Sequence, residues 1–158
     1  SVYRPVPHGT LAVGLRMGAT EPLGDDTGEA ENLQIPLASR FFAGGRVSHR
    51  AFRTDRLGVP GQTLSDAGDP LGGNALLLVN VDWVRDIKGI LSGVLFVDAG
   101  NVWAGPDVVD LSDLRWGVGL GLRVATPAGP LRLEYGRKLE PRDDEPGGQL
   151  YLSFGPPF

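Results

Sequence analysis

The chain of 158 residues contains no cysteine and only two histidines, His8 and His49. The absence of cysteine excludes disulfide bonds and thiolate chemistry, and two distant histidines without a His-Glu-x-x-His spacing argue against a zinc site. No stretch approaches the roughly 18 to 20 consecutive apolar residues that a membrane-spanning helix needs. The formal net charge of −4 argues against nucleic acid as a partner, because duplex binding depends on a basic surface.

Signatures of targeting and catalysis are also lacking. Residues 1–7 have neither the basic start nor the apolar core of a signal peptide, so we expect a mature protein or a fragment. Ser48, His49 and Asp98 could suggest a hydrolase triad, but no Gly-x-Ser-x-Gly elbow accompanies them. The glycine-rich run 117–121 has no helix after it, as a phosphate-binding loop would require. We therefore expect no enzyme activity, no catalytic or metal-binding residues and no cofactor.

What the sequence does contain is a strict alternation in its last third. One parity is apolar, with Trp116, Val118, Leu120, Leu122 and Val124, and the other is small or charged, with Arg115, Gly117, Gly119, Gly121 and Arg123. The alternation returns as Leu131, Leu133 and Tyr135 against Arg132, Glu134 and Lys138, and then as Leu150, Leu152 and Phe154. Because strand side chains point to opposite faces with a period of two, this predicts a sheet with one apolar and one polar face.

The pattern predicts about six strands, at roughly 8–20, 74–84, 91–101, 113–125, 130–139 and 149–158. Each approaches the 9 to 11 residues of a tilted transmembrane strand. The connections alternate between long and short, and the longest covers residues 21–73. Outer-membrane barrels have long extracellular loops and short periplasmic turns, so the alternation places the C-terminus on the periplasmic side.

We therefore predict an all-β fold, an antiparallel transmembrane β-barrel of the bacterial outer membrane. Because the smallest single-chain barrels have about eight strands, residues 1–158 are expected to form a single partial β-barrel domain. It would supply about six C-terminal strands of a larger barrel of roughly 16 strands, or close by pairing with another copy. A connection as long as 21–73 is usually functional or disordered, and we expect a function.

Several motifs stand in a fixed order along the chain. They are Arg40-Phe41-Phe42-Ala43-Gly44-Gly45, Ser48-His49-Arg50-Ala51-Phe52, Phe96-Val97-Asp98-Ala99-Gly100-Asn101-Val102, Gly117-Val118-Gly119-Leu120-Gly121-Leu122-Arg123 and Phe154-Gly155-Pro156-Pro157-Phe158. In this order, from about residue 9 to the end, they resemble the barrel of the BamA/TamA superfamily of outer-membrane insertases and translocators. The resemblance implies that residues 21–73 form a long extracellular loop that folds back into the barrel lumen.

The resemblance also implies a site in that lumen. In the family, the arginine of a Val-Arg-Gly-Phe/Tyr motif meets acidic residues on the inner wall. Here the motif keeps Arg50 and Phe52 and follows Gly44 and Gly45, and the matching wall positions are Asp98 and Asp82. A guanidinium group can hold a carboxylate in a bidentate pair, and could in this way pin the loop to the wall.

Alternatives to this site remain open from the sequence. Arg50 could be a solvated loop arginine, as most charged loop residues are. Leu76 and Leu78 share the parity of Asp82, which argues against an inward-facing Asp82. Ala51 stands where the motif has glycine, and alanine tolerates a positive φ poorly, so the geometry of the turn is open.

The C-terminal segment resembles the β-signal by which the assembly machinery recognises barrel substrates, with Phe154 and the terminal Phe158. The alternative is a pair of aromatic residues at the membrane interface. Pro156 and Pro157 remove two backbone donors, so this end suits an edge strand or a seam. In the family, the seam between the last and first strands is a lateral gate for client strands.

The function implied by the resemblance is the non-enzymatic assembly and insertion of outer-membrane β-barrel proteins through that seam. The implied partners are outer-membrane lipid, unfolded barrel or secreted polypeptide clients, and periplasmic docking domains or accessory proteins outside this chain. Nucleic acid is not expected as a partner. Two alternatives are a polypeptide translocation pore of the two-partner-secretion type, with the loop as its plug, and a soluble β-sandwich binding module.

Overall fold

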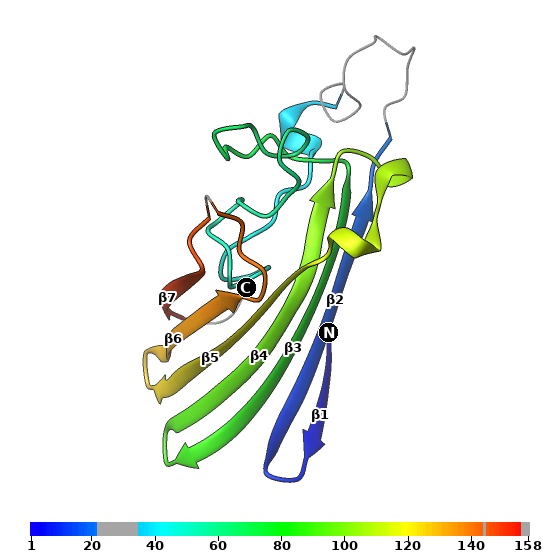
Figure 1. Cartoon of the computed structure of the whole chain (residues 1–158). Helices are drawn as coiled ribbons and strands as arrows, with labels where there is room; N and C mark the ends of the chain where they lie inside the picture. Colours follow the sequence, from blue (N-terminus) through cyan, green and yellow to red (C-terminus); the bar gives the residue numbers. More distant parts are fainter. Residues whose placement is uncertain (22–34, 144, 156–158) are drawn as a thin grey trace.

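The computed structural model describes residues 1–21, 35–143 and 145–155, and most of them lie in β-strands (Figure 1). The strands are β1 (Val2–Val6), β2 (Gly9–Ala19), β3 (Ala75–Lys88), β4 (Leu91–Trp103), β5 (Arg115–Thr126), β6 (Gly129–Lys138) and β7 (Gly148–Phe154). They form one sheet in chain order, and each strand is antiparallel to its neighbours. Three short 3-10 helices lie in the connections: η1 (Leu37–Ser39), η2 (Pro106–Val108) and η3 (Leu111–Asp113). Across the described ranges, no helix has the length and apolar character needed to span a membrane.

The predicted all-β antiparallel fold is confirmed, with one correction to the strand count. The predicted strands correspond to β2–β7, and a seventh strand, β1, precedes them. The sequence pattern missed β1 because it is only five residues long and contains Pro5, and proline argues against a strand interior. The sandwich alternative is wrong, because the seven strands make one sheet and not two packed sheets.

The two ends of the sheet differ in the length of their connections (Figure 1). Residues 7–8, 89–90 and 127–128 make tight turns at one end, and the long connections leave the other end. The strand β3 has 14 residues and continues to Lys88, beyond the predicted end at Val84. Both β3 and β4 are therefore longer than the 9 to 11 residues that cross a bilayer.

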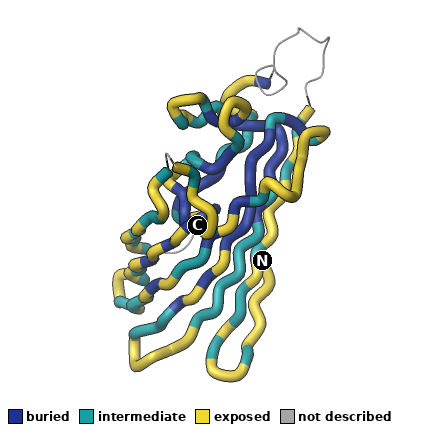
Figure 2. The backbone as a smooth tube through the Cα atoms, viewed as in Figure 1, coloured by how far each residue is buried: buried dark blue, intermediate teal, exposed yellow. Residues whose placement is uncertain are grey.

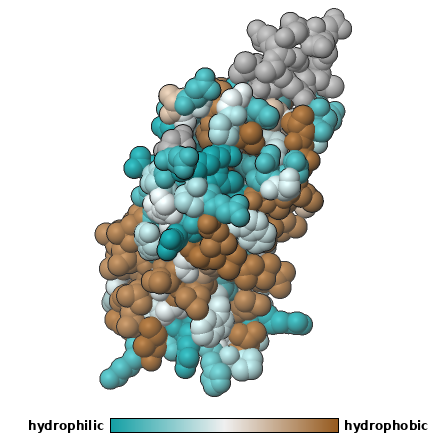
Figure 3. All heavy atoms as spheres, viewed as in Figure 1, coloured by the Kyte–Doolittle hydropathy of each residue, from teal (hydrophilic) through white to brown (hydrophobic). Residues whose placement is uncertain are grey.

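The outer face of the sheet is apolar and exposed. Leu95, Leu120 and Leu152 have exposed fractions of 52%, 60% and 70%. Hydrophobic residues gather over the strands in Figure 3, and hydrophilic residues cover the strand tips at one end and the loop-bearing part at the other. Such a surface is unlike that of a soluble sheet, whose apolar face is packed. Ala99, which shares the parity of Leu95, is an exception, because it is buried beside its register partner Trp116.

The opposite face, here called the inner face, is covered near the long-connection end by residues 35–73, here called the inner loop. The inner loop and the inner face of the sheet pack together in a hydrophobic cluster, which lies in the buried part of the chain in Figure 2. Its members are Ala43, Ala51, Phe52 and Leu57 of the inner loop and Leu76, Leu78 and Val102 of the strands. The apolar inward residues of β3, which argued against an inward Asp82, are therefore the floor on which the loop packs.

Candidate functional site in the inner loop

The inner loop is shaped by a tight turn that begins at two glycines. Gly44 and Gly45 have φ values of +112° and +96°, which side chains with a Cβ rarely adopt. The Ser48 hydroxyl accepts a hydrogen bond from the Gly44 N–H at 2.9 Å and donates one to the Gly44 carbonyl at 2.7 Å. The Gly45 N–H is shared between the carbonyls of His49 and Phe52, at 3.2 and 3.0 Å. These bonds close the turn that carries Arg50.

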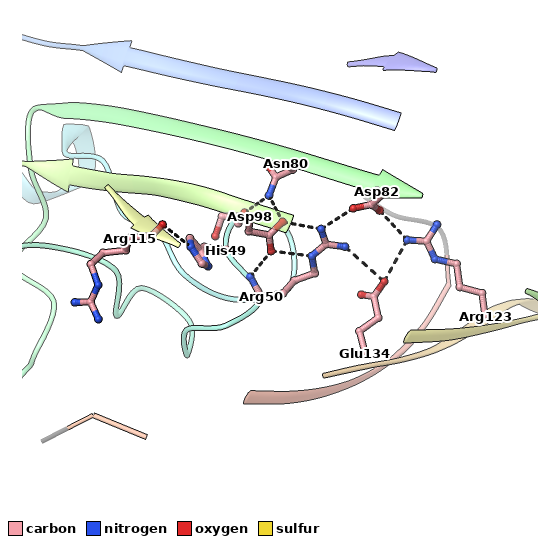
Figure 4. Close-up of polar contacts among 9 residues, drawn as sticks. His49, Arg50, Asn80, Asp82, Asp98, Arg115, Arg123 and Glu134 are labelled. Atoms are coloured by element: carbon pink, nitrogen blue, oxygen red, sulfur yellow. Dashed lines mark hydrogen bonds and ion pairs between the residues drawn. The ribbon is translucent and has the colours of Figure 1, made fainter. Parts of the chain in front are cut away.

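Arg50 extends from this turn onto Asp98 at the centre of β4 (Figure 4). The Nε atom donates to Asp98 Oδ2 at 2.9 Å and Nη2 donates to Oδ1 at 2.6 Å, which is a bidentate pair. The backbone N–H of Arg50 donates to the same Oδ2 at 2.8 Å. The Asp98 side chain is fully buried, and that of Arg50 is 7% exposed. Arg50 is therefore not a solvated loop residue.

The Arg50 guanidinium also contacts β3 and β6. Nη2 donates to Asp82 Oδ1 at 2.6 Å, and Nη1 lies 3.8 Å from Glu134 Oε1. The guanidinium carbon lies 3.6 Å from the ring centroid of Phe96, a cation–π contact. Arg123 of β5 bridges the two outlying carboxylates, since its Nη2 donates to Asp82 at 3.0 Å and to Glu134 at 3.2 Å. One loop residue is thus tied to several strands.

Asn80 completes the surroundings of Asp98. Its Nδ2 donates to Asp98 Oδ1 at 2.7 Å and to the Ser48 carbonyl at 2.6 Å, so it joins the wall to the turn. Burial disfavours the charge of Arg50, but the hydrogen bonds to Asp98 and Asp82 outweigh it and raise the arginine pKa above its ordinary value. Arg50 therefore carries its positive charge in this site.

His49, next to Arg50, is fully buried, and its pKa is shifted in the direction opposite to that of Arg50. Its Nε2 lies 3.0 Å from the carbonyl oxygen of Arg115, which can only accept, so Nε2 carries a proton. The Nδ1 atom has no hydrogen-bond partner within the described ranges. Burial lowers the pKa of His49, and the attraction of Asp98 only partly opposes this shift. The imidazole is therefore neutral at pH 7.

Two glycines of the sheet allow the loop backbone to approach it. A Cβ on Gly136 of β6 would lie 2.5 Å from the Arg50 carbonyl oxygen, and a Cβ on Gly117 of β5 would lie 2.6 Å from the Cβ atom of Ala51. Ala51 is 1% exposed and does not have a positive φ. Alanine therefore fits at this motif position without backbone strain.

Phe52 forms a second anchor for the inner loop. Lys138 Nζ lies 4.3 Å from its ring centroid and the Arg115 guanidinium carbon lies 5.1 Å from it. The Tyr151 hydroxyl of β7 donates to the Phe52 carbonyl. Glu145, from the β6–β7 connection, pairs with Arg115 at 2.7 Å and with Lys138 at 3.1 Å, which holds both cations beside the ring.

The structure brings together the predicted loop and wall residues: Gly44, Gly45, Arg50, Phe52, Asp82 and Asp98. Phe154 lies apart from them, 61% exposed on the outer face, and Phe158 lies outside the described residues. The sequence analysis did not single out Glu134, Asn80 or Arg123 as partners of the loop. Glu134 and Arg123 have the inward parity, which could have identified them, but Asn80 lies among apolar residues and gave no signal. In the described part of the chain, no group of three or more histidine or acidic side chains could hold a metal ion.

Comparisons with known proteins give the family and the fold to which this chain is similar. The family model of the Omp85 superfamily domain matches residues 7–158. The outer membrane protein assembly factor BamA of Nitratidesulfovibrio vulgaris is 31% identical over 126 residues, which are 77% of this chain and 16% of that protein. The crystal structure of BamA from Haemophilus ducreyi lacking POTRA domains 1–3 superposes with a TM-score of 0.70 at 22% identity, over 95% of this chain and 32% of that one. The chain thus spans about a sixth of the length of this curated relative.

Proposed function

Because this chain belongs to the Omp85 superfamily, whose members lie in the bacterial outer membrane, we propose that it serves the assembly of β-barrel proteins into that membrane. The proposed role is that of a non-enzymatic insertase. The exposed apolar outer face would contact lipid, and the inner loop would occupy the lumen from the extracellular side. The observation that carries the proposal is the tie between Arg50 and Asp98, which fixes the loop to the barrel wall.

The proposed mechanism depends on strand edges. Within the described residues, β7 pairs only with β6, so at a seam its other edge would present a row of unpaired backbone groups. Unpaired backbone in hydrocarbon is costly, and a client strand that pairs with such an edge would relieve this cost. The client's own strand pairing would then supply the driving force, without nucleotide or covalent chemistry. Phe154 would lie beside this seam.

A rigid loop is useful in this mechanism. A barrel whose wall opens at a seam needs the rest of its structure to stay in place, and the loop connects β3, β4, β5 and β6 through one guanidinium group and the glycines beneath it. We therefore propose that the loop braces the part of the wall that adjoins the opening. The proposed partners are outer-membrane lipid and unfolded barrel clients, with periplasmic docking domains or accessory proteins outside this chain.

A test of the proposal is the folding of a client in liposomes. The client is a urea-unfolded eight-stranded outer-membrane barrel, and its folding is followed by the shift between folded and unfolded bands in an unheated gel. We expect liposomes that contain the protein to fold the client several-fold faster than empty liposomes, and Arg50→Ala to lose most of this gain. Arg53→Ala, which changes an exposed arginine of the same loop, is the matched control. Equal rates with and without the protein would contradict the proposal.

The second candidate is a polypeptide translocation pore, which the plug-like position of the inner loop favours. A plug held by Arg50 predicts that Arg50→Ala raises the single-channel conductance of the protein in planar bilayers. Raised conductance with unchanged client folding would favour the pore. Lost client folding with unchanged conductance would favour the insertase.

A further inference from the structure

A polar cavity lies beneath the tip of the inner loop and beside the Arg50 site. It has a volume of about 260 Å³ and is bounded by Arg46, Val47 and Arg50 of the loop and by residues of β1, β2, β3, β5 and β6. This volume is slightly below the roughly 300 to 1,000 Å³ of pockets that take drug-sized ligands, so the cavity suits a small group. It is distinct from the apolar cluster around Phe52.

The lining of the cavity is strongly basic. Five arginines and two carboxylates line the cavity, and Asp98 pairs with Arg50 from outside the lining, which leaves an excess of two positive charges in a chain whose formal net charge is −4. The arginines are Arg16, Arg46, Arg50, Arg123 and Arg132, and the carboxylates are Asp82 and Glu134. Charges of one sign that line a recess focus the electrostatic field and attract the opposite charge.

Both carboxylates of the lining already have arginine partners. Asp82 accepts hydrogen bonds from Arg50 and Arg123, and Glu134 accepts one from Arg123 and pairs with Arg50. The buried Nε atoms of Arg123 and Arg132 have no hydrogen-bond partner in the described residues. Arg132 shares the lining with the like-charged Arg123 and Arg46, which repel it, and with Glu134 and Asp82, which attract it. The lining thus has more positive charge than its carboxylates balance.

We propose that this cavity binds a small oxyanion of the phosphate class, held by Arg46 of the loop and Arg132 of the wall. Guanidinium groups match phosphate oxygens with paired donors, and an anion with two negative charges would balance the excess in the lining. An anion between Arg46 and Arg132 replaces their repulsion with a bridge, so its binding stabilises the docked loop. The phosphate group comes either from a free anion or from a lipid headgroup. This inference is independent of the proposed assembly activity.

The binding experiment titrates inorganic pyrophosphate into the protein in maltoside micelles at constant ionic strength, and measures the heat of binding. We expect saturable binding to the wild type, and roughly tenfold or greater weakening in Arg46→Gln, because charge-assisted hydrogen bonds are lost. Arg85→Gln removes the same charge from an exposed position near the β3–β4 turn and is expected to bind within twofold of the wild type. Arg46 lies in the loop and outside every strand, so its substitution leaves sheet pairing intact.

A second measurement distinguishes the sources of the phosphate. The rate of chymotrypsin cleavage after Phe52 reports the opening of the loop. Protection by pyrophosphate in pure maltoside micelles indicates a free anion, and protection only by micelles that contain phosphatidic acid indicates a lipid headgroup; either supports the site if Arg46→Gln abolishes it. The proposal is overturned if neither ligand binds or protects, or if Arg46→Gln and Arg85→Gln weaken binding equally.

Discussion

At the scale of single residues, Asp98 is the point on which the inner loop depends. It accepts hydrogen bonds from the Arg50 side chain and backbone and from Asn80, and no part of its side chain is exposed. A buried carboxylate is tolerated only when it is paired and fully hydrogen-bonded. The pair therefore specifies where the loop lies, because any other position leaves a charge buried without a partner.

The first prediction concerns the loss of this pair. Arg50→Ala leaves Asp98 and Asp82 without their main partner, and removing one member of a buried pair costs about 3–5 kcal/mol. We expect chymotrypsin to cleave after Phe52 at least tenfold faster than in the wild type. Arg50→Lys should give a similar defect despite its charge, because an ammonium group cannot form the bidentate pair.

The control for this prediction is Arg53→Ala, which removes an exposed arginine three positions along the same loop. Its cleavage rate should match that of the wild type. An Arg50→Ala variant that remains as resistant as the Arg53→Ala variant would show that the pair does not hold the loop.

The second prediction concerns pH. The pKa of buried His49 is lowered in the folded state, so the unfolded state binds the proton more readily and stability falls as the pH drops below about 6.5. Arg50 and Arg115 repel the protonated ring and Asp98 attracts it. We expect the wild type to lose up to about 1.4 kcal/mol per pH unit below 6.5, measured by guanidinium chloride unfolding between pH 7.5 and pH 5.

His49→Gln keeps a donor for the Arg115 carbonyl but cannot take up a proton. Its loss of stability over the same pH range should therefore be smaller than that of the wild type. Equal losses in both proteins would mean that His49 does not account for the pH dependence.

At the scale of secondary-structure elements, the glycines of β5 and β6 have a defined purpose. Gly117 and Gly136 have inward parity. A Cβ on Gly136 would overlap the backbone of Arg50 and Ala51, and a Cβ on Gly117 would overlap the side chains of Ala51 and His49. The alternation of glycine with apolar residues thus does two things in one strand. The apolar residues of one parity form the outer face. The glycines of the other parity leave the space that the inner loop occupies, here called its seat.

The third prediction follows from this seat. Gly136→Val places side-chain atoms within 2.5–2.8 Å of the Arg50 and Ala51 backbone, which cannot move aside without breaking the turn. We expect the loop to leave its seat, with faster chymotrypsin cleavage after Phe52 and unchanged β-sheet circular dichroism. Gly147→Val is the matched control, because Gly147 is exposed and a Cβ there has no neighbour within 4 Å. Unchanged cleavage in Gly136→Val would contradict the seat.

At the scale of the whole molecule, the chain separates two environments across one sheet. The outer face exposes leucine, valine and aromatic side chains, and the inner face carries the charged network and the loop. A soluble sheet would bury the first set and expose the second. In an outer-membrane barrel the arrangement is favourable, because hydrocarbon contacts the outer face and water the inner one.

The fourth prediction tests the outer face. Leu120→Arg places a charge in the middle of the apolar band, where arginine costs about 2–4 kcal/mol at the bilayer midplane. We expect a marked loss of the protein fraction that floats with liposomes. Leu111→Arg changes an equally exposed leucine in a connection and should insert normally. Equal flotation of the two variants would indicate that Leu120 does not face lipid.

The sequence by itself determined the strand periodicity, the separation of the two faces and the order of long and short connections. These features follow from local rules, since the side-chain period of a strand is readable in any alternating segment. The same rules failed for β1, whose five residues are too few to show a period. Arg50, Asp98 and Asp82 were identified as partners only through a resemblance, because residues 32 and 48 positions apart have no local signal of contact.

Only the tertiary structure decided how the loop is held. Leu76 and Leu78 pack beneath the loop, Arg123 binds Asp82, and Lys138 lies beside the Phe52 ring. Each of these contacts joins segments that are distant in the chain. Whether a charged inward residue meets a partner or water depends on the register of several strands and on the path of the loop. That choice is made by packing and by the cost of burying an unpaired charge, which the residue pattern of a single strand does not contain.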